Sequence, residues 1–258
     1  MAARLFVEQP LGAAAPEEDF ALPAGAARHV QVLRLQPGGQ VVLFDGSGDE
    51  WTAEVTAMGR SEVRVVLRER HSVDRELRPS VTLAVVMPAN DRMDGIVEKA
   101  CELGATAIQP LMSERSVLRL TGDRAQKKQA HWQGVAIAAA EQCGRTRPLW
   151  VAPVQTLSAW LAGLPAQPQS QPAAGGERRW LLSPVAAEPL STRSREGHGP
   201  VVVLSGPEGG LSADEEQAAR ARGFFAVQLG PRILRADTAP LAVLGWVALG
   251  GTDGASAV

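Results

Sequence analysis

The feature that most constrains the fold of this chain is an alternation of apolar runs and helical segments in its C-terminal two thirds. The run at 81–87 is apolar except for Thr82, which is typical of a strand buried on both faces of a sheet. Within 91–103, Met93, Ile96 and Ala100 recur at helical spacing. Such alternation predicts an α/β fold with a parallel sheet. The expected strands are 81–87, 107–111, 150–154, 180–183, 200–205 and 226–229, and the expected helices are 91–103, 121–142 and 238–249, with another beginning near Ser212.

Residues 1–72 follow a different pattern, in which short alternating runs surround one helical segment at 26–35. The runs 41–44 and 51–55 flank a glycine-containing turn and predict a hairpin. We therefore expect a small β-barrel domain at 1–72, a polar linker at 73–80 and an α/β domain at 81–258. The Pro- and Gln-rich segment 165–179 is expected to be a mobile surface loop without a chemical role.

The composition is that of a globular protein without a membrane span. Hydrophobic residues make up 45% of the 258 residues and charged residues 21%, and no uninterrupted apolar run reaches membrane-spanning length. The N-terminus lacks the apolar core of a signal peptide. Cys101 and Cys143 are far apart, which argues against a zinc site or a disulfide framework and favours a cytoplasmic protein without a bound metal.

The charge distribution contains one basic segment. The net charge of the chain is −2, so the protein as a whole does not favour nucleic acid. Residues 111–150, however, hold seven Lys or Arg residues against three acidic ones, a local charge of +4. This segment is either a phosphate-contacting surface or the solvated face of a helix.

The stretch LSGPEGGLSADE at 204–215 joins an apolar strand to a helix through a glycine-rich turn. It has neither the Lys of a nucleotide-binding P-loop nor the glycine spacing of a dinucleotide site. Ser212 and Glu215 fit a capping box, which occupies the helix N-terminus that would otherwise bind phosphate. With Glu208 in the turn, the sequence favours a neutral or cationic ligand, or a tight turn without a ligand.

A second glycine-marked stretch, LGPRILRADTAP at 229–240, follows the last expected strand. Its apolar residues Ile233 and Leu234 lie between two arginines, and Asp237 or Thr238 can cap the next helix. In open α/β sheets, ligands bind at the carboxyl ends of the strands. The two stretches are therefore expected to form one pocket, with Ile233 and Leu234 as an apolar floor suited to an adenine ring.

These two stretches resemble the signature segments of the RsmE-type ribosomal RNA methyltransferases, which belong to the SPOUT class. Three further blocks are similar in the same order: HVQVLRLQPGGQVVLFDG at 29–46, MDGIVEKACELGATAIQPLMSERS at 93–116 and AIAAAEQCGRTRPL at 136–149. The resemblance covers nearly the whole chain outside 165–179. It departs from the family at Arg92, where Lys is frequent, and at Asp237, where Glu is frequent.

The resemblance implies a PUA-like RNA-binding barrel followed by a SPOUT-type parallel-sheet methyltransferase domain with a C-terminal trefoil knot. It also implies a homodimer that transfers a methyl group from S-adenosylmethionine to N3 of a uridine in 16S ribosomal RNA, with the pocket near the subunit interface. The alternatives are a non-catalytic RNA-binding or assembly protein on the same fold, or a methyltransferase for another RNA site. The implied cofactor-binding residues are Leu204, Ser205, Gly206, Glu208, Gly209, Gly210, Leu229, Gly230, Ile233, Leu234 and Ala236.

The charged residues receive roles from the chemistry of the transfer. Arg232 and Arg235 are candidates for stabilising the anion that develops on the uracil carbonyls, or else they bind phosphate or brace the loop. Glu141 and Asp237 are candidate bases, although Glu141 and the arginine four residues later would also make an ordinary helical ion pair. The residues expected to contact RNA are Arg28, Arg34, Arg115, Arg145 and Arg147.

Overall fold

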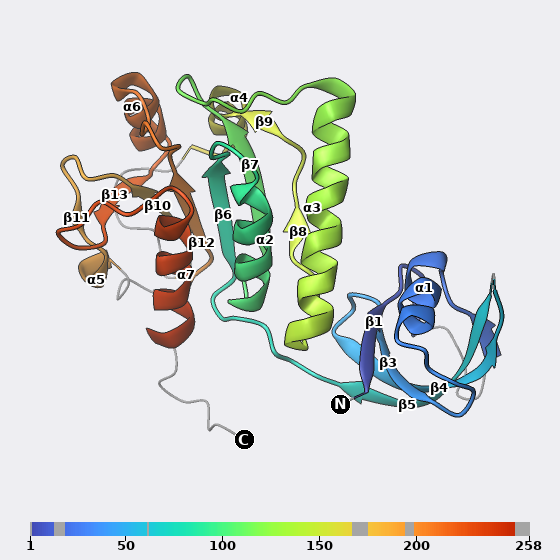
Figure 1. Cartoon of the computed structure of the whole chain (residues 1–258). Coiled ribbons are helices and arrows are strands. Elements are labelled where there is room, and N and C mark those ends of the chain that lie inside the picture. Colours follow the sequence, from blue (N-terminus) through green and yellow to red (C-terminus); the bar gives the residue numbers. More distant parts are fainter. Residues whose placement is uncertain (1, 13–18, 61, 167–174, 194–198, 251–258) are drawn as a thin grey trace. The chain divides into compact units, whose positions relative to one another are not determined.

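A computed structural model describes the chain at residues 2–12, 19–60, 62–166, 175–193 and 199–250. The chain divides into two compact units (Figure 1). The first unit holds residues 1–76 together with 137–148, and the second holds 77–136 and 149–258. The sequence did not indicate that 137–148 belongs with the N-terminal residues.

The described residues of the first unit form a five-stranded sheet and one complete helix. The strand order is β1-β3-β4-β5-β2, in which β1 runs parallel to β3 and the other neighbours are antiparallel. Two register shifts between β4 and β5 mark bulges, which bend long strands and increase their twist. The elements are β1 (Ala3–Phe6), β2 (Asp19–Ala21), α1 (Ala24–Val32), β3 (Gln40–Phe44), β4 (Asp49–Met58) and β5 (Val63–Ser72).

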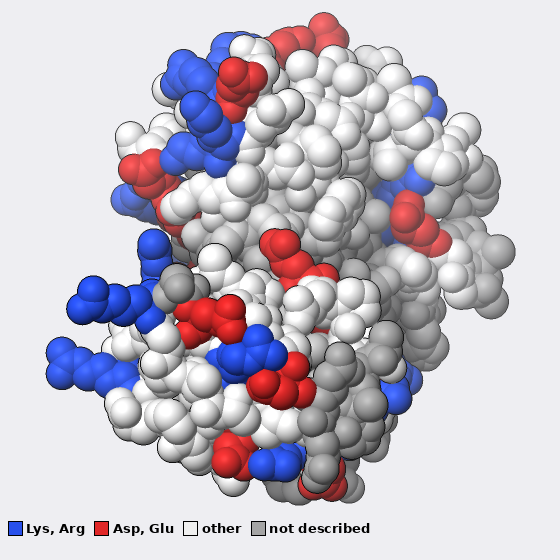
Figure 2. Space-filling view, turned by 90° about the vertical axis from the view of Figure 1, so that its right-hand side faces the viewer, with Lys and Arg blue, Asp and Glu red and all other residues white. Residues whose placement is uncertain are grey.

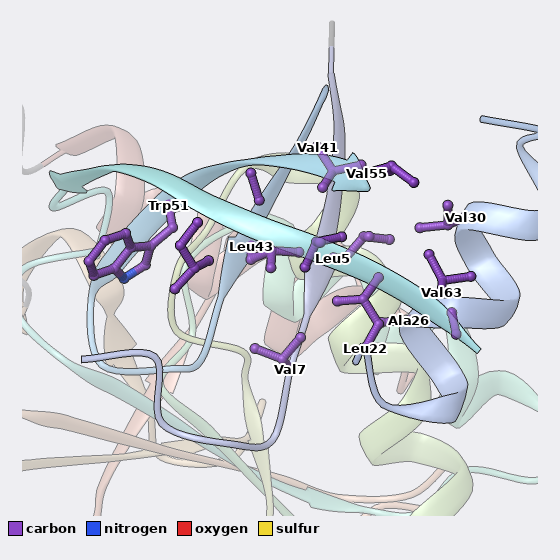
Figure 3. Packing of buried hydrophobic residues seen from close by; sticks show 14 of the residues in the cluster. Leu5, Val7, Leu22, Ala26, Val30, Val41, Leu43, Trp51, Val55 and Val63 are labelled. Carbon is purple, nitrogen blue, oxygen red and sulfur yellow. The ribbon is translucent and has the colours of Figure 1, made fainter. Parts of the chain in front are cut away.

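The core of the first unit lies between this sheet and α1 (Figure 3). Leu43 and Val55 are fully buried on neighbouring strands, and Val30 of α1 is fully buried against the same cluster. On β4 the residues Trp51, Ala53 and Val55 are buried in alternation with half-buried polar ones. The apolar residues of the alternating sequence pattern therefore form the inward face of the predicted hairpin.

The second unit is built on a parallel sheet of order β11-β13-β10-β12-β6-β7-β8, with β9 also paired to β7. This confirms the predicted α/β class. Its strands are β6 (Val81–Val86), β7 (Ala107–Met112), β8 (Trp150–Val151), β9 (Gln155–Thr156), β10 (Arg178–Leu182), β11 (Glu188–Pro189), β12 (Val201–Ser205) and β13 (Phe225–Gln228). Its helices are α2 (Arg92–Glu102), α3 (Gly122–Cys143, whose last turns belong to the first unit), α4 (Leu157–Gly163), α5 (Leu190–Arg193), α6 (Ala213–Ala221) and α7 (Thr238–Gly250).

Helices cover both faces of this sheet. Ala84 of β6 and Leu204 of β12 pack in one cluster with residues of α4 and α6. Their strand neighbours Val85 and Val203 point the opposite way and are also fully buried. Figure 1 shows α2 and α7 next to each other in front of β6 and β12, and α7 contacts both strands. Burial on both faces explains why these strands are almost entirely apolar and do not alternate with polar residues.

The structure corrects the expected loop at 165–179 at its C-terminal end. Arg178 and Arg179 lie in β10 and are buried. Arg179 donates to the carbonyl oxygens of Pro165 and Arg222 at 2.8 and 2.7 Å, so its charge is satisfied inside the unit. Residues 167–174 lie outside the described residues.

Within the described part of the chain, no helix is long and apolar enough to cross a membrane, and no cluster of three His, Cys, Asp or Glu side chains could hold a metal ion.

Candidate active site

Four loops meet at one edge of the parallel sheet in the second unit. Because β13, β10, β12 and β6 are neighbours and all run in the same direction, their carboxyl ends lie together. The segments that follow them are 229–237, 183–187, 206–212 and 87–91. Both glycine-marked stretches of the sequence are therefore brought to the same edge, as expected.

Two adjoining cavities lie among these loops. The larger, of about 530 Å³, is lined by the β12–α6 turn and the β13–α7 loop. The smaller, of about 250 Å³, is lined by Leu229, Gly230 and Arg232 and shares Leu182 and Leu234 with the larger one. Leu204 is the predicted cofactor residue outside both linings, because its side chain is buried in the core against α4 and α6. The other predicted cofactor-binding residues in the larger lining are Ser205, Gly206, Glu208, Gly209, Gly210, Ile233, Leu234 and Ala236.

The shape of the β12–α6 turn depends on glycine at two positions. Gly210 has φ +68°, which is left-handed, and its N–H donates to the Pro207 carbonyl at 2.9 Å. At Gly206 an added Cβ would lie 3.1 Å from the backbone nitrogen of Leu211. The turn therefore folds back tightly on itself and exposes backbone groups to the cavity.

The capping box predicted for α6 is confirmed. The Ser212 hydroxyl accepts the Glu215 N–H at 3.2 Å, and the Glu215 carboxylate accepts the Ser212 N–H at 2.9 Å. Glu215 also accepts the N–H of Glu114 at 2.8 Å, which ties the segment after β7 to α6. The N-terminus of this helix is thus already occupied by its own side chains.

Ser205 carries a buried hydroxyl that has no partner among the described residues. The residue is 2% exposed and lines the larger cavity, and its hydroxyl oxygen makes no hydrogen bond to any described residue. A buried hydroxyl without a partner is energetically unfavourable, so most such groups in proteins are hydrogen-bonded. A ligand with a polar atom at this depth would satisfy it.

Among the described residues, the carboxylates of Glu208 and Glu216 line the larger cavity, and both are engaged. Glu208 accepts the Ala89 N–H at 3.1 Å and lies 3.8 Å from Nη1 of Arg92. Glu216 accepts a hydrogen bond from the Ser183 hydroxyl at 2.8 Å. The contacts of Glu208 favour a bracing role for this residue over a purely electrostatic one.

The β13–α7 loop presents one apolar and two basic side chains to solvent. Ile233 is 92% exposed, so it lies at the rim of the cavities and is not their floor, contrary to the expectation from sequence. Leu234 is half-buried, as a floor residue should be. Arg232 and Arg235 are exposed, and no described acidic residue forms an ion pair with either. Their charges are therefore available to a ligand.

Glu141, the other candidate base, belongs to the first unit and is held by groups of that unit. Its carboxylate accepts the Phe6 N–H at 2.9 Å and lies 3.3 Å from Nδ1 of His29. The helical pair with Arg145 is also absent from its contacts, because Arg145 pairs with Glu76 through Nε at 3.3 Å. Glu141 is thus a structural group of the first unit, and the structure does not support it as a catalytic base.

The arginines expected to bind RNA divide into free and engaged groups. Arg28 and Arg34 are exposed at α1 and just after it. Arg145 has a side chain only 5% exposed and bonded to Glu76, so it is not accessible to a phosphate. Arg147 donates to the Ser47 carbonyl at 2.6 Å, and Arg115 to the Gly209 carbonyl at 2.8 Å. Arg115 therefore supports the β12–α6 turn from outside.

The basic segment 111–150 does not form one continuous free surface. Arg119 donates to the Glu114 carbonyl at 3.0 Å, and Lys128 lies 3.4 Å from Asp91. Figure 2, which shows one face of the molecule, has acidic side chains close to some of the basic ones. Asp91 therefore neutralises part of the segment's positive charge at Lys128, and Arg119 is held by a backbone carbonyl.

Comparison with known proteins identifies the family. Residues 75–248 match the RNA methyltransferase domain family, and residues 22–68 match the RNA methyltransferase PUA domain family. The ribosomal RNA small subunit methyltransferase E of Synechocystis sp. is 36% identical over 83% of this chain and 67% of its own length. The chain belongs to the ribosomal RNA small subunit methyltransferase E family. The Bacillus subtilis member is 29% identical over 93% of this chain and 94% of its own length.

A solved structure of the same family agrees with the whole fold. The small subunit methyltransferase E of Neisseria gonorrhoeae, bound to S-adenosyl methionine, superposes with a TM-score of 0.85 at 35% identity. The match covers 95% of this chain and 96% of that one. The methyltransferase domain and the preceding PUA-like domain expected from sequence are thereby confirmed.

Sequence reasoning missed several residues that line the two cavities. Leu182 at the end of β10 and Pro184 just after it line both cavities, and Glu216 lines the larger one. The signal for the first two was present, because an apolar strand with a polar turn at its carboxyl end borders the same sheet edge. Glu216 could have been found from its position in the first turn of α6, next to the capping-box residue Glu215.

Proposed function

We propose that this chain uses S-adenosylmethionine to methylate N3 of a uridine in 16S ribosomal RNA. The observation that carries the proposal is the cavity formed by both signature loops, with the unpartnered Ser205 hydroxyl in its lining. A relative that matches nearly the whole chain binds the same methyl donor. The absence of Lys from the β12–α6 turn fits a donor that carries a positive sulfonium rather than a phosphate.

The donor would be held mainly by backbone groups and apolar side chains. The end of β12 supplies Ser205, the β12–α6 turn supplies Gly206 and Gly210, and the β13–α7 loop supplies Leu234 and Ala236. The smaller cavity beside Leu229 and Gly230 extends the site along the same edge. Such a site fixes the methyl group in position, so that alignment with the acceptor nitrogen replaces a bimolecular encounter.

The acceptor requires the loss of a proton from N3 of uracil, and negative charge then develops on the ring carbonyls. Arg232 and Arg235 are exposed at the cavity and have no described acidic partner, so they are the proposed stabilising cations. Asp237 is the remaining candidate base; its side chain is 35% exposed and lies 3.8 Å from Arg92.

The two domains would divide the work. Residues 1–72 are proposed to bind RNA through exposed arginines such as Arg28 and Arg34, and residues 81–258 to carry out the transfer. We also propose a homodimer, because α7 exposes Trp246 and Leu249 although it is apolar almost throughout. A protein that modifies small-subunit RNA is expected to act in the cytoplasm.

The test combines donor binding with a map of the product. Calorimetric titration with S-adenosylmethionine should show saturable binding, and radiolabelled methyl groups should enter small subunits from a strain that lacks this gene. Mass spectrometry should then place the label on N3 of one uridine. Replacement of both Arg232 and Arg235 by Ala should lower the transfer rate at least about 100-fold while donor binding persists.

The matched control is Arg124→Ala, which removes an exposed arginine of α3 outside both cavity linings and should leave the rate unchanged. Absence of donor binding by the wild-type protein would favour the non-catalytic RNA-binding alternative. Label at another RNA position would refute the N3 assignment and leave the methyltransferase activity standing.

A further inference from the structure

Arg92 lies where the candidate cofactor cavity meets a second hollow. It is the first residue of α2, directly after the loop that follows β6. Its side chain is 30% exposed and lines the 530 Å³ cavity. It also lines a groove of about 640 Å³ between α2 and α7, whose apolar wall includes Ile96 and Leu241.

The guanidinium of Arg92 lies between two carboxylates that belong to different loops. Its Nη1 is 3.8 Å from Oε1 of Glu208 in the β12–α6 turn and 3.8 Å from Oδ2 of Asp237 at the end of the β13–α7 loop. Glu208 in turn accepts the N–H of Ala89 from the loop that precedes Arg92. One cation therefore connects three of the four segments at this sheet edge.

Electrostatics explains why a cation is needed at this point. Glu208 and Asp237 are both within ion-pair distance of the same nitrogen, so without Arg92 two negative charges would face each other across a short gap. All three side chains are partly exposed, and ion pairs of this kind add little to overall stability. Their effect is instead on the positions of the two loops relative to each other.

We infer that Arg92 is a positioning residue that holds the β12–α6 turn and the β13–α7 loop together and thereby preorganises the donor site. The inference rests on the proposed function in one respect, namely that the ligand is S-adenosylmethionine. A site whose walls come from two separate loops binds more weakly when those loops must be ordered at the moment of binding. Because Arg92 holds the two loops in place in the free protein, less ordering of the loops has to accompany donor binding.

The first test is donor affinity in Arg92→Gln. The dissociation constant of S-adenosylmethionine should rise about tenfold, with an unchanged melting temperature. The constant for the neutral product S-adenosylhomocysteine should rise by the same factor, because Arg92 acts on the loops and not on the sulfonium charge. Arg92→Lys should bind within about threefold of wild type, since an ammonium group can also lie between two carboxylates.

The matched control is Lys99→Gln on the same helix. Lys99 loses the same charge and lines the same groove, but it pairs with Glu98 and Glu102 of its own helix and reaches neither loop. Its donor affinity should equal that of wild type. The double variant Glu208→Gln and Asp237→Asn lacks the two charges that Arg92 separates. Adding Arg92→Gln to it should raise the dissociation constant of S-adenosylmethionine much less than tenfold.

A second readout needs no ligand. In the free protein, Arg92→Gln should increase hydrogen exchange of amides in 206–212 and 229–237, and Lys99→Gln should not. If exchange in both loops and donor affinity match wild type, the inference is wrong. It is also wrong if Arg92→Gln changes the dissociation constants of the donor and of its neutral product by different factors. That outcome would mean that Arg92 acts on the sulfonium charge and not on the loops. Failure of the wild-type protein to bind the donor would refute the proposed function, while the exchange result would still decide the role of Arg92.

Discussion

At the scale of single residues, the backbone conformation of Gly210 disfavours a side chain, although there is room for one. Its φ of +68° is left-handed, yet a Cβ at this position would meet no atom within 4 Å. Gly210→Ala should therefore destabilise the protein by about 1–2 kcal/mol through the backbone alone. Because the same turn lines the cavity, donor affinity should fall with it. Chemical denaturation and calorimetric titration measure the two effects.

Gly134 is the control for this substitution. It is exposed in the middle of α3, and a Cβ there also meets nothing within 4 Å, but its backbone is helical. Gly134→Ala should raise the free energy of unfolding by about 0.8–1 kcal/mol. Equal effects of the two substitutions would contradict a left-handed conformation at Gly210 that disfavours any side chain.

At the scale of elements, the start of α6 is the best-defined local structure of the site. Ser212→Ala removes one of the two capping-box hydrogen bonds and should lower the free energy of unfolding by about 1 kcal/mol. Glu215 would keep its bond from the Glu114 N–H, so the segment after β7 should stay in place. Denaturant unfolding tests the first statement, and hydrogen exchange at Glu114 tests the second. Faster exchange there would show that the cap and this contact are coupled.

The elements that the sequence predicted are those whose signals are local. The strand, turn and cap at 201–215 all follow from neighbouring residues, and so does the helical spacing in α2. The helix α4 was missed because it has only 7 residues, although its cap was visible: Thr156 accepts the Ala159 N–H at 3.2 Å. The edge strands β1 and β2, of 4 and 3 residues, are too short to show a period of two.

The roles of charged residues were harder to predict than the loops that carry them. Parallel strands bring their carboxyl ends together whatever the loop sequence, so both signature stretches were placed correctly. The partners of Glu208, Glu141 and Arg145 come from distant parts of the chain, in contacts that no spacing rule reveals. The assignment of 137–148 to the first unit depends on the same kind of contact.

At the scale of the whole molecule, the first unit contains two populations of arginine. Arg28 and Arg34 are exposed and have no ion-pair partner among the described residues. Arg64 and Arg68, by contrast, pair with Asp19 at 2.9 Å and Glu54 at 2.8 Å. Replacing Arg28 and Arg34 by Ala should reduce the slope of log affinity for RNA against log salt by about 1.4–1.8, as expected for two lost phosphate contacts.

The corresponding double Ala variant of Arg64 and Arg68 is the control, and its salt slope should stay within error of wild type. Filter binding over a series of KCl concentrations gives both slopes. A larger change in the control than in the test variant would place the RNA surface on the strand face of the sheet and not at α1. Donor binding should be unaffected in either variant, since none of these residues belongs to the unit that holds the cavities.

The first unit also contains a carboxylate that links its sheet to the segment after α3. Glu50 is bonded to Arg4 at 2.5 Å and Arg75 at 3.1 Å, and Arg75 donates to the Gly144 carbonyl at 2.8 Å. Burial raises the pKa of Glu50, but the hydrogen bonds from Arg4 and Arg75 outweigh it, and the net pKa lies below the ordinary 4.5. A lowered carboxyl pKa stabilises the folded state above the unfolded pKa, and this contribution is lost as the pH falls through the folded value.

Glu50→Gln should therefore lower the free energy of unfolding of the first unit by about 1.5–3 kcal/mol at neutral pH. The difference from wild type should be constant above pH 4.5 and shrink below it, because the unfolded chain then takes up a proton at Glu50 while the folded state still holds the carboxylate. It should be lost once the pH has fallen below the folded pKa, where Glu50 is protonated in both states. Hydrogen exchange of β4 and β5 amides, measured from pH 7 down to about pH 3, reports this unit specifically. Glu54→Gln is the control on the same strand: its pair with Arg68 is partly exposed, so it should change stability by less than about 1 kcal/mol. If the difference in free energy of unfolding between Glu50→Gln and wild type stayed the same at about pH 3, Glu50 would stabilise the unit by its shape and packing and not by its charge.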